Sequence, residues 1–208
     1  SFRSVGKNDG FVFCLNKLLE PVFEKQIGSV YDDDVQSMVV DNQGNLVVTG
    51  GYSEELRTSG IKLPLVSGKT DVFVIKFNSK GIAIWSDGFG SKANDYSTSI
   101  AINKIGRIYI TGSTRGSIIK DQFKTKVGET GNNIFISKYS DDGILILLDT
   151  LGTNRTNFNR KIEIDEEGYL LITGNFYRNQ LISKDNAKKK DNDNDNFHLT
   201  KLFDCDSQ

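Results

Sequence analysis

Residues 71–85 read Asp-Val-Phe-Val-Ile-Lys-Phe-Asn-Ser-Lys-Gly-Ile-Ala-Ile-Trp, and residues 88–114 read GFGSKANDYSTSIAINKIGRIYITGST; together they decide the fold class. Apolar residues alternate along 71–77, which places Phe73, Ile75 and Phe77 on one face of an extended strand. The Asn-x-x-Gly segment that follows has the residues of a tight turn. Similar short segments come next, and no helical period interrupts them. We therefore expect four short strands here, at 71–77, 82–85, 99–102 and 107–111.

This four-strand pattern recurs along the chain with a fixed step of 62 residues. The step separates four phenylalanines, Phe11, Phe73, Phe135 and Phe197 (73 − 11, 135 − 73 and 197 − 135). A fixed period of this size is typical of repeat proteins. The sequence therefore divides into the end of a preceding unit at 1–8, complete units at 9–70, 71–132 and 133–194, and the first strand of a further unit at 195–208. The other two complete units have expected strands at 11–15, 22–26, 37–40 and 45–49, and at 134–139, 144–148, 161–164 and 169–173.

A single unit cannot bury its own apolar residues. Both faces of the strand 71–77 carry apolar side chains, because Val72 and Val74 lie opposite Phe73 and its neighbours. Radial stacking of four-stranded sheets covers both faces. We therefore predict an all-β fold of β-propeller blades, with the four antiparallel strands of each 62-residue unit in one sheet. A β-solenoid is the alternative, although the unit contains no shorter period.

Three complete units make an incomplete ring, since propellers have about four to eight blades. The repeat is already under way in the first residues and continues into the last ones. We expect the chain to be a piece of a longer array. The alternative is that several copies join to complete a ring.

The composition argues against several functional classes. The chain has 26 Lys and Arg against 27 Asp and Glu, so no basic excess indicates a nucleic-acid partner. No apolar run is long enough to span a membrane. The two cysteines, Cys14 and Cys205, are too few for a disulfide framework. We interpret them as unrelated thiols; a bond tying the two ends of the array together is the alternative.

The acidic segments do not predict a metal site. The run Asp32-Asp33-Asp34 offers oxygens for calcium, but an Asp or Asn recurs at positions 33, 95 and 157, which favours a turn-capping role. In 191–196 Asp alternates with Asn (Asp191, Asp193, Asp195), yet the Gly and Glu that an EF-hand loop requires are absent. We expect a polar loop there.

No residue set predicts a catalytic or cofactor site either. His198 is the single histidine, and no partner base accompanies it, so we interpret it as a strand residue. Trp85 aligns with Phe23 one unit earlier, which favours a core position over a sugar platform. The sequence Asn154-Arg155-Thr156 fits a glycosylation sequon, which many unmodified proteins also contain.

Segment 71–114 resembles the bacterial β-propeller repeat family of the seven-bladed type. The residues 41–50, Asp-Asn-Gln-Gly-Asn-Leu-Val-Val-Thr-Gly, match the last part of its repeat closely, and 103–112 and 165–174 match it with substitutions. The resemblance covers three units and the opening strand of a fourth. It implies a surface or secreted protein in which the propeller binds or supports other molecules, and it transfers no catalytic residue.

Variation between the units indicates where function lies. The strands and turn glycines repeat, whereas the long connections at 53–64, 115–126 and 176–190 share almost no side chains. We expect a non-enzymatic scaffold for protein interaction or assembly, outside the cytoplasm, whose partners are proteins or further blades of the same array. One alternative is a carbohydrate- or ligand-binding module that uses Tyr52, Tyr96 and Tyr177. Another is part of an enzyme whose active site lies in blades outside this chain.

Overall fold

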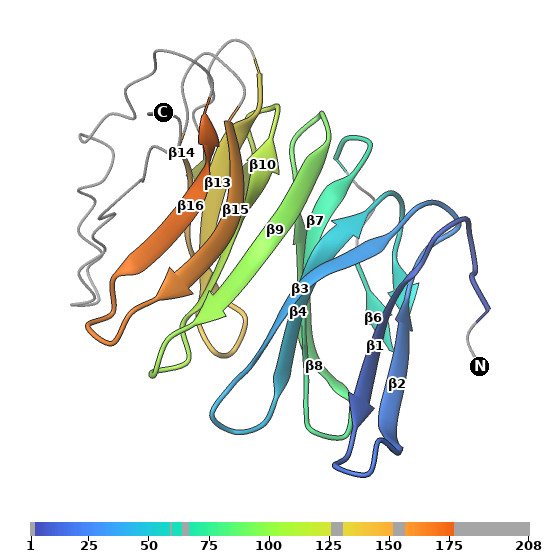
Figure 1. The fold of residues 1–208 in the computed structure, drawn as a ribbon. Helices are drawn as coiled ribbons and strands as arrows, with labels where there is room; N and C mark the ends of the chain where they lie inside the picture. The colour runs from blue at the N-terminus through green and yellow to red at the C-terminus, as the bar shows by residue number, and fades with distance from the viewer. Residues whose placement is uncertain (1–2, 59, 64–66, 126–130, 152–156, 177–208) are drawn as a thin grey trace, which may run out of the picture.

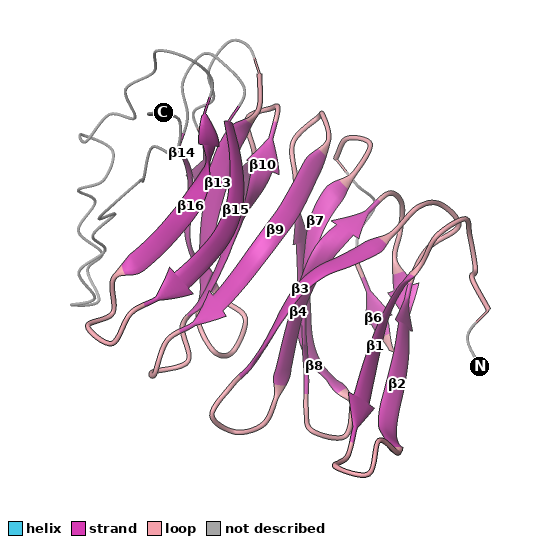
Figure 2. Cartoon of the chain, in the orientation of Figure 1, coloured by secondary structure: helices cyan, strands magenta, loops and turns pink. Residues whose placement is uncertain are grey.

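A computed structural model describes residues 3–58, 60–63, 67–125, 131–151 and 157–176. All of the regular structure in these ranges is β-strand (Figure 2). Each of the twelve strands expected in the three complete units is present. The strands are β1 (Gly10–Leu15), β2 (Pro21–Ile27), β3 (Asp34–Val40), β4 (Leu46–Tyr52), β5 (Arg57–Thr58), β6 (Ile61–Lys62), β7 (Asp71–Phe77), β8 (Ala83–Phe89), β9 (Asp95–Ile102), β10 (Ile108–Thr114), β11 (Ile119–Lys120), β12 (Phe123–Lys124), β13 (Asn133–Tyr139), β14 (Leu145–Leu151), β15 (Asn157–Ile164) and β16 (Leu170–Phe176).

The described strands form two complete four-stranded sheets with a two-stranded sheet on either side. The complete sheets have the orders β3-β4-β7-β8 and β9-β10-β13-β14, and all neighbouring strands are antiparallel. The pairs β1-β2 and β15-β16 lie at the two ends of the array (Figure 1). These separate antiparallel sheets are propeller blades and exclude the β-solenoid.

Each complete sheet joins the last two strands of one 62-residue unit to the first two of the next. The prediction that the four strands of one unit share a sheet is therefore wrong. The long connection after β4 returns the chain to the same sheet, where β7 pairs with β4 from Leu46↔Phe77 to Tyr52↔Asp71. The shorter Gly-containing connections, such as 90–94 between β8 and β9, pass from one sheet to the next. The sequence repeat and the sheets thus have the same period but differ in phase by half a unit.

The first strands of successive sheets lie side by side, β3 against β9 and β9 against β15, and the sheets fan out from them (Figure 1). Apolar cores fill the spaces between neighbouring sheets. One core holds Phe73 and Ile75 of β7 together with Val12 of β1, and the next holds Val72 and Val74 together with Phe135 of β13. The two apolar faces predicted for residues 71–77 are confirmed, because every residue of β7 is buried.

Thr-Gly pairs repeat at 49–50, 111–112 and 173–174, and each pair lies inside a strand (β4, β10 and β16) that continues beyond the expected end at the threonine. Gly50 and Gly112 sit opposite irregularities in the neighbouring strands β3 and β9. A Cβ atom on Gly112 would be 2.0 Å from the backbone oxygen of Tyr96, and one on Gly50 would be 1.8 Å from that of Asp34. Glycine is required here because two backbones approach closely, as is common at β-bulges.

Candidate functional site

The long connections, predicted to carry function, place some of their residues in the core. The first forms the hairpin β5-β6 and the second forms β11-β12. Leu56 and Ile118 occupy equivalent positions in the two connections, and both are completely buried. The backbone N–H groups of Leu63 and Thr125, also equivalent and buried, donate to their carbonyl oxygens at 3.0 Å. At these positions the two connections fill space between sheets, and their other described residues are intermediate or exposed, apart from the buried Ile61. Most of the third connection, from residue 177 on, lies outside the described residues.

Exposed positions that vary from unit to unit also occur in the tight turns that join the first and second strands of each sheet. These turns are 41–44 (β3-β4), 103–106 (β9-β10) and 165–168 (β15-β16). The two central residues of each turn are exposed and different in the three units: Asn42-Gln43, Lys104-Ile105 and Glu166-Glu167. The turns thus present three different chemical surfaces at equivalent places.

A common backbone geometry holds the three turns. The first side chain of each turn accepts hydrogen bonds from the backbone N–H groups two and four residues later, at distances between 2.8 and 3.1 Å. The last residue of each turn has a positive φ, of 79°, 82° and 90° at Gly44, Gly106 and Gly168. The variable side chains are therefore presented from a rigid frame.

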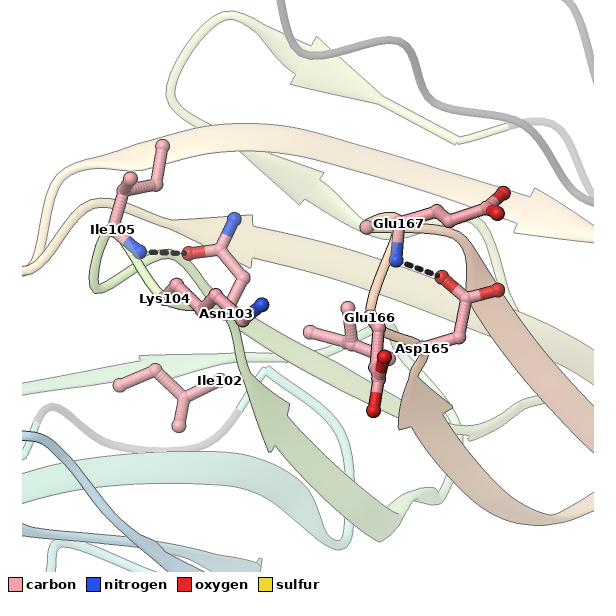
Figure 3. A pocket seen from close by; sticks show the side chains of 9 residues that line it. Ile102, Asn103, Lys104, Ile105, Asp165, Glu166 and Glu167 are labelled. Atoms are coloured by element: carbon pink, nitrogen blue, oxygen red, sulfur yellow. Dashed lines mark hydrogen bonds between the residues drawn. The ribbon is translucent and has the colours of Figure 1, made fainter.

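A groove of about 420 Å³ separates the second and third turns. Ile102 and Ile164, at the ends of β9 and β15, supply apolar lining, and Lys104 and Ile105 lie opposite Asp165, Glu166 and Glu167. In Figure 3 the Glu166 side chain lies between the two turns, whereas Glu167 extends away from the opposite turn. The first and second turns are linked directly, because Asn42 Nδ2 donates to the Lys104 carbonyl oxygen at 3.3 Å.

The charges along this groove are available to a ligand. Asp165 is engaged by the backbone of its own turn, but the carboxylates of Glu166 and Glu167 form no ion pair or hydrogen bond with a described residue. The ammonium group of Lys104 has no such partner among the described residues either. Ile105 is 63% exposed on the opposite rim. The groove therefore combines an acidic wall, one cation and exposed apolar surface.

The three acids of the predicted calcium candidate have separate structural partners. Asp32 accepts from Asn8 Nδ2 at 2.6 Å, and Asp34 accepts from the Gly51 N–H at 2.8 Å. Asp33 is buried and accepts from the Ser29 hydroxyl at 2.6 Å and the Ser53 N–H at 3.1 Å. The turn-capping interpretation of position 33 is confirmed. Within the described ranges no group of three His, Cys, Asp or Glu residues could hold a metal ion.

Asp95, one unit after Asp33, has the same kind of hydrogen-bond partners, and its charge interacts with that of a second buried acid, Asp71. Asp95 accepts from the Ser91 N–H at 2.6 Å and hydroxyl at 2.9 Å, and Asp71 accepts from the Ser67 N–H at 2.7 Å. Burial raises the pKa of Asp95 to about 6; hydrogen bonds from Thr114 and Ser91 oppose this rise, and the charge of Asp71 adds to it. Burial also raises the pKa of Asp71 and of Asp33. These carboxyls with raised pKa values lie where neighbouring sheets meet and do not line the groove.

An ion cluster around the buried Lys76, which the sequence did not reveal, links two sheets. Lys76 Nζ lies 2.9 Å from Asp41 and 2.5 Å from Asp141, which belongs to the turn between β13 and β14. Burial alone would raise the pKa of Asp41, but hydrogen bonds from Lys76 and from Asn45 and Gln43 lower it to about 2. Trp85 Nε1 donates to the Asp141 carbonyl oxygen at 2.9 Å, and its ring stacks on Tyr139. Trp85 is therefore part of the contact between sheets, as predicted.

Of the remaining predicted candidates, the structure describes Tyr52, Tyr96 and Cys14. Tyr52 is buried and unsuited to a platform, whereas Tyr96 is 43% exposed. Cys14 is a partly exposed thiol without a disulfide. The other predicted candidates lie outside the described residues: Tyr177, Asp191, Asp193, Asp195, His198, Cys205 and the sequon 154–156. The described residues include no helix that is long and apolar enough to cross a membrane.

Comparison with known proteins supports the propeller fold. No known family profile matches the chain. The chain is similar to an uncharacterized WD repeat-containing protein of Acanthamoeba polyphaga mimivirus, with 23% identity over 195 residues that cover 80% of this chain and 14% of the relative. WD repeats build β-propellers, so the match agrees with the observed sheets. The chain thus spans only a small part of this relative, and the specific resemblance to the bacterial seven-bladed repeat stays a prediction.

Proposed function

We propose that this chain is a non-enzymatic β-propeller segment that serves as a scaffold for protein interaction. The observation that carries the proposal is the groove between the turns 103–106 and 165–168, where side chains that vary between units stand on a constant backbone frame. Similarity to a WD repeat-containing protein supports it, because propeller repeats present surfaces for other molecules. The extracellular location predicted from the sequence stays a prediction.

The chemistry of the groove indicates the kind of protein segment that it suits. Glu166 favours a cationic side chain in the groove, and Ile102, Ile105 and Ile164 favour an apolar neighbour beside it. An extended peptide with Lys or Arg next to Leu or Ile combines both features. Complementary charge of this kind contributes more to specificity and to the rate of association than to affinity.

Fluorescence anisotropy with short labelled peptides tests this proposal. A peptide that carries alternating Arg and Leu should bind, and the same peptide with Glu in place of Arg should not. Glu166→Lys should weaken binding about tenfold, since a lost and inverted charge costs about 1.4 kcal/mol or more. Glu20→Lys, on the distant turn between β1 and β2, is the matched charge control and should bind as the wild type does. Equal binding of the Arg and Glu peptides would refute the proposal.

The carbohydrate-binding alternative has weaker support from the geometry. It needs aromatic rings on the surface, and of its two described candidates only Tyr96 is exposed. A glycan array with wild-type protein and Tyr96→Ala compares the two hypotheses directly. Glycan binding that depends on Tyr96 and not on Glu166 would favour the alternative.

A further inference from the structure

The tight turn between β1 and β2 differs from its counterparts in the later units. It carries Lys17, Leu18 and Leu19, which we call the tip, and all three residues are exposed. Leu18 and Leu19 are each 77% exposed, more than any other large apolar residue in the described ranges. The counterparts of Leu18 are Lys80 and Asp142, and both are exposed although their turns lie inside the array. Position 18 therefore faces solvent even where a sheet lies on either side, and among the three units only the first has an apolar residue there.

Leu19 has a backbone conformation that leucine rarely adopts. Its φ is 62°, and its counterparts are Gly81 and Gly143, with φ of 73° and 86°. In the later units the glycine also makes room for an aromatic ring. A Cβ atom on Gly81 would lie 2.7 Å from the Phe23 ring, and one on Gly143 would lie 2.6 Å from the Trp85 ring. Leucine suits neither the turn nor this packing, and a strained residue of this kind indicates a functional contact.

The chemistry of the tip matches that of the groove. The Lys17 ammonium group forms no ion pair with a described residue, and the Glu166 carboxylate in the groove forms none either. The two leucines beside this cation match the apolar lining of the groove, which consists of Ile102, Ile105 and Ile164. The tip thus has the cation and the apolar neighbours that the groove suits.

The tip and the groove lie at the same end of the sheets, which is the lower end in Figure 1. The sheet β3-β4-β7-β8 stands between them, so the tip is remote from the groove of its own chain. Two copies that face each other with this end can place each tip in the groove of the other copy. Such an exchange of identical contacts is closed by a two-fold axis.

We propose that the chain forms a two-fold dimer in which the tip of each copy occupies the groove of the other. This inference rests on the groove of the proposed function and names a second copy of the chain as its partner. In each contact Lys17 pairs with Glu166, while Leu18 and Leu19 cover the apolar lining. The contact joins turns to turns and adds no strand to a sheet.

Sedimentation velocity of the full chain tests the dimer. The protein is studied from about 1 µM to about 1 mM, with a reductant that keeps the cysteines as thiols, and we expect a reversible change from monomer to dimer. Lys17→Glu should weaken the dimer about a hundredfold, because about tenfold is lost at each of the two contacts. Lys80→Glu, on the corresponding turn one unit later, is the matched control and should dimerise as the wild type does.

An exchange of charges tests the pairing itself. Glu166→Lys alone should weaken the dimer to the same extent as Lys17→Glu. The double variant with both substitutions should dimerise as the wild type does, because each reversed tip then meets a reversed groove. Structural damage by one substitution would not be repaired by the other.

Two substitutions of the leucines separate the contact from folding. Leu19→Gly gives the turn the glycine of the later units, so its stability in urea should be no lower than that of the wild type, while the dimer should be weakened about tenfold. Leu18→Ser should also weaken the dimer. It should leave binding of the Arg and Leu peptide to the groove unchanged at protein concentrations below those of dimer formation.

Three results would overturn the dimer: a wild-type chain that stays monomeric at every concentration, an equal effect of Lys17→Glu and Lys80→Glu, or a double variant that does not recover. Peptide binding to the groove decides the proposed function separately. If the peptide binds while the chain stays monomeric, the dimer is wrong and the groove takes a segment of another protein.

Discussion

Replacing Asp95 by Asn should make the protein more stable at neutral pH and less sensitive to pH. Asp95 is completely buried, and one of its carboxylate oxygens accepts both hydrogen bonds from Ser91. An Asn oxygen can accept the same two bonds without carrying a charge. The chain itself uses this replacement, because the third unit has Asn133 and Asn157 where the second has Asp71 and Asp95.

The size of the effect follows from the pKa of Asp95, which burial raises from 3.8 to about 6 in the folded protein. Between these two values the folded state binds a proton that the unfolded state has released, so the free energy of unfolding falls as pH rises. The slope approaches about 1.4 kcal/mol per pH unit, and the total loss by pH 7 is about 3 kcal/mol. The contribution of Asp95 is thus fully present below pH 3.8 and is lost above pH 6. In Asp95→Asn this part of the pH dependence should be absent.

Urea unfolding followed through Trp85 measures the effect, since this single tryptophan lies in the contact between two sheets. The free energy of unfolding is determined from pH 4 to pH 8 for the wild type, for Asp95→Asn and for the exposed control Asp32→Asn. The control should keep the wild-type slope, whereas Asp95→Asn should be flatter and should exceed the wild type at pH 7. Asp95→Asn could instead be less stable than the wild type at pH 7, with the same dependence of the free energy of unfolding on pH. In that case the assigned cost of burying this carboxylate is wrong.

Three further substitutions test the contacts between sheets, each by urea unfolding at pH 7. Lys76→Met should destabilise the protein by about 3 kcal/mol because it leaves the buried Asp41 without its cation, and a loss below about 1 kcal/mol would contradict this. Gly112→Ala should cost about 3 kcal/mol, since its Cβ would meet a backbone oxygen at 2.0 Å; wild-type stability would show that the strands can separate there. Ile118→Ala should cost about 2–5 kcal/mol and leave peptide binding to the groove unchanged, whereas lost binding without lost stability would return function to the long connections.

The sequence predicted the positions of the strands well because their signals are local. Alternation along 71–77 and the Asn-x-x-Gly turn after it depend only on neighbouring residues, and β7 has the predicted bounds. Which strands pair is a long-range property. The pairing of Leu46 with Phe77 joins two units across a long connection, and the fixed step of 62 residues is equally compatible with either phase. The sequence alone therefore could not show that each sheet is displaced by half a unit from the sequence repeat.

Burial inside the long connections was hidden from the sequence for a related reason. The connections at 53–64 and 115–126 differ in most side chains, but both keep an apolar residue at the equivalent positions Leu56 and Ile118. One shared apolar residue in a divergent segment is too weak a signal to indicate burial. Conversely, the turns 103–106 and 165–168 look like ordinary structural turns, and only the placement of the sheets brings them together around the groove.

The two ends of the array differ from its middle in the contacts that stabilise each sheet. In a repeat array each sheet is stabilised by its own contacts and by those with its neighbours. The sheet β3-β4-β7-β8 has cores on both sides, whereas among the described residues the pair β1-β2 packs against one core. A two-stranded sheet is marginally stable alone, so β1-β2 depends mainly on Val12 and Ile27 packed against β7.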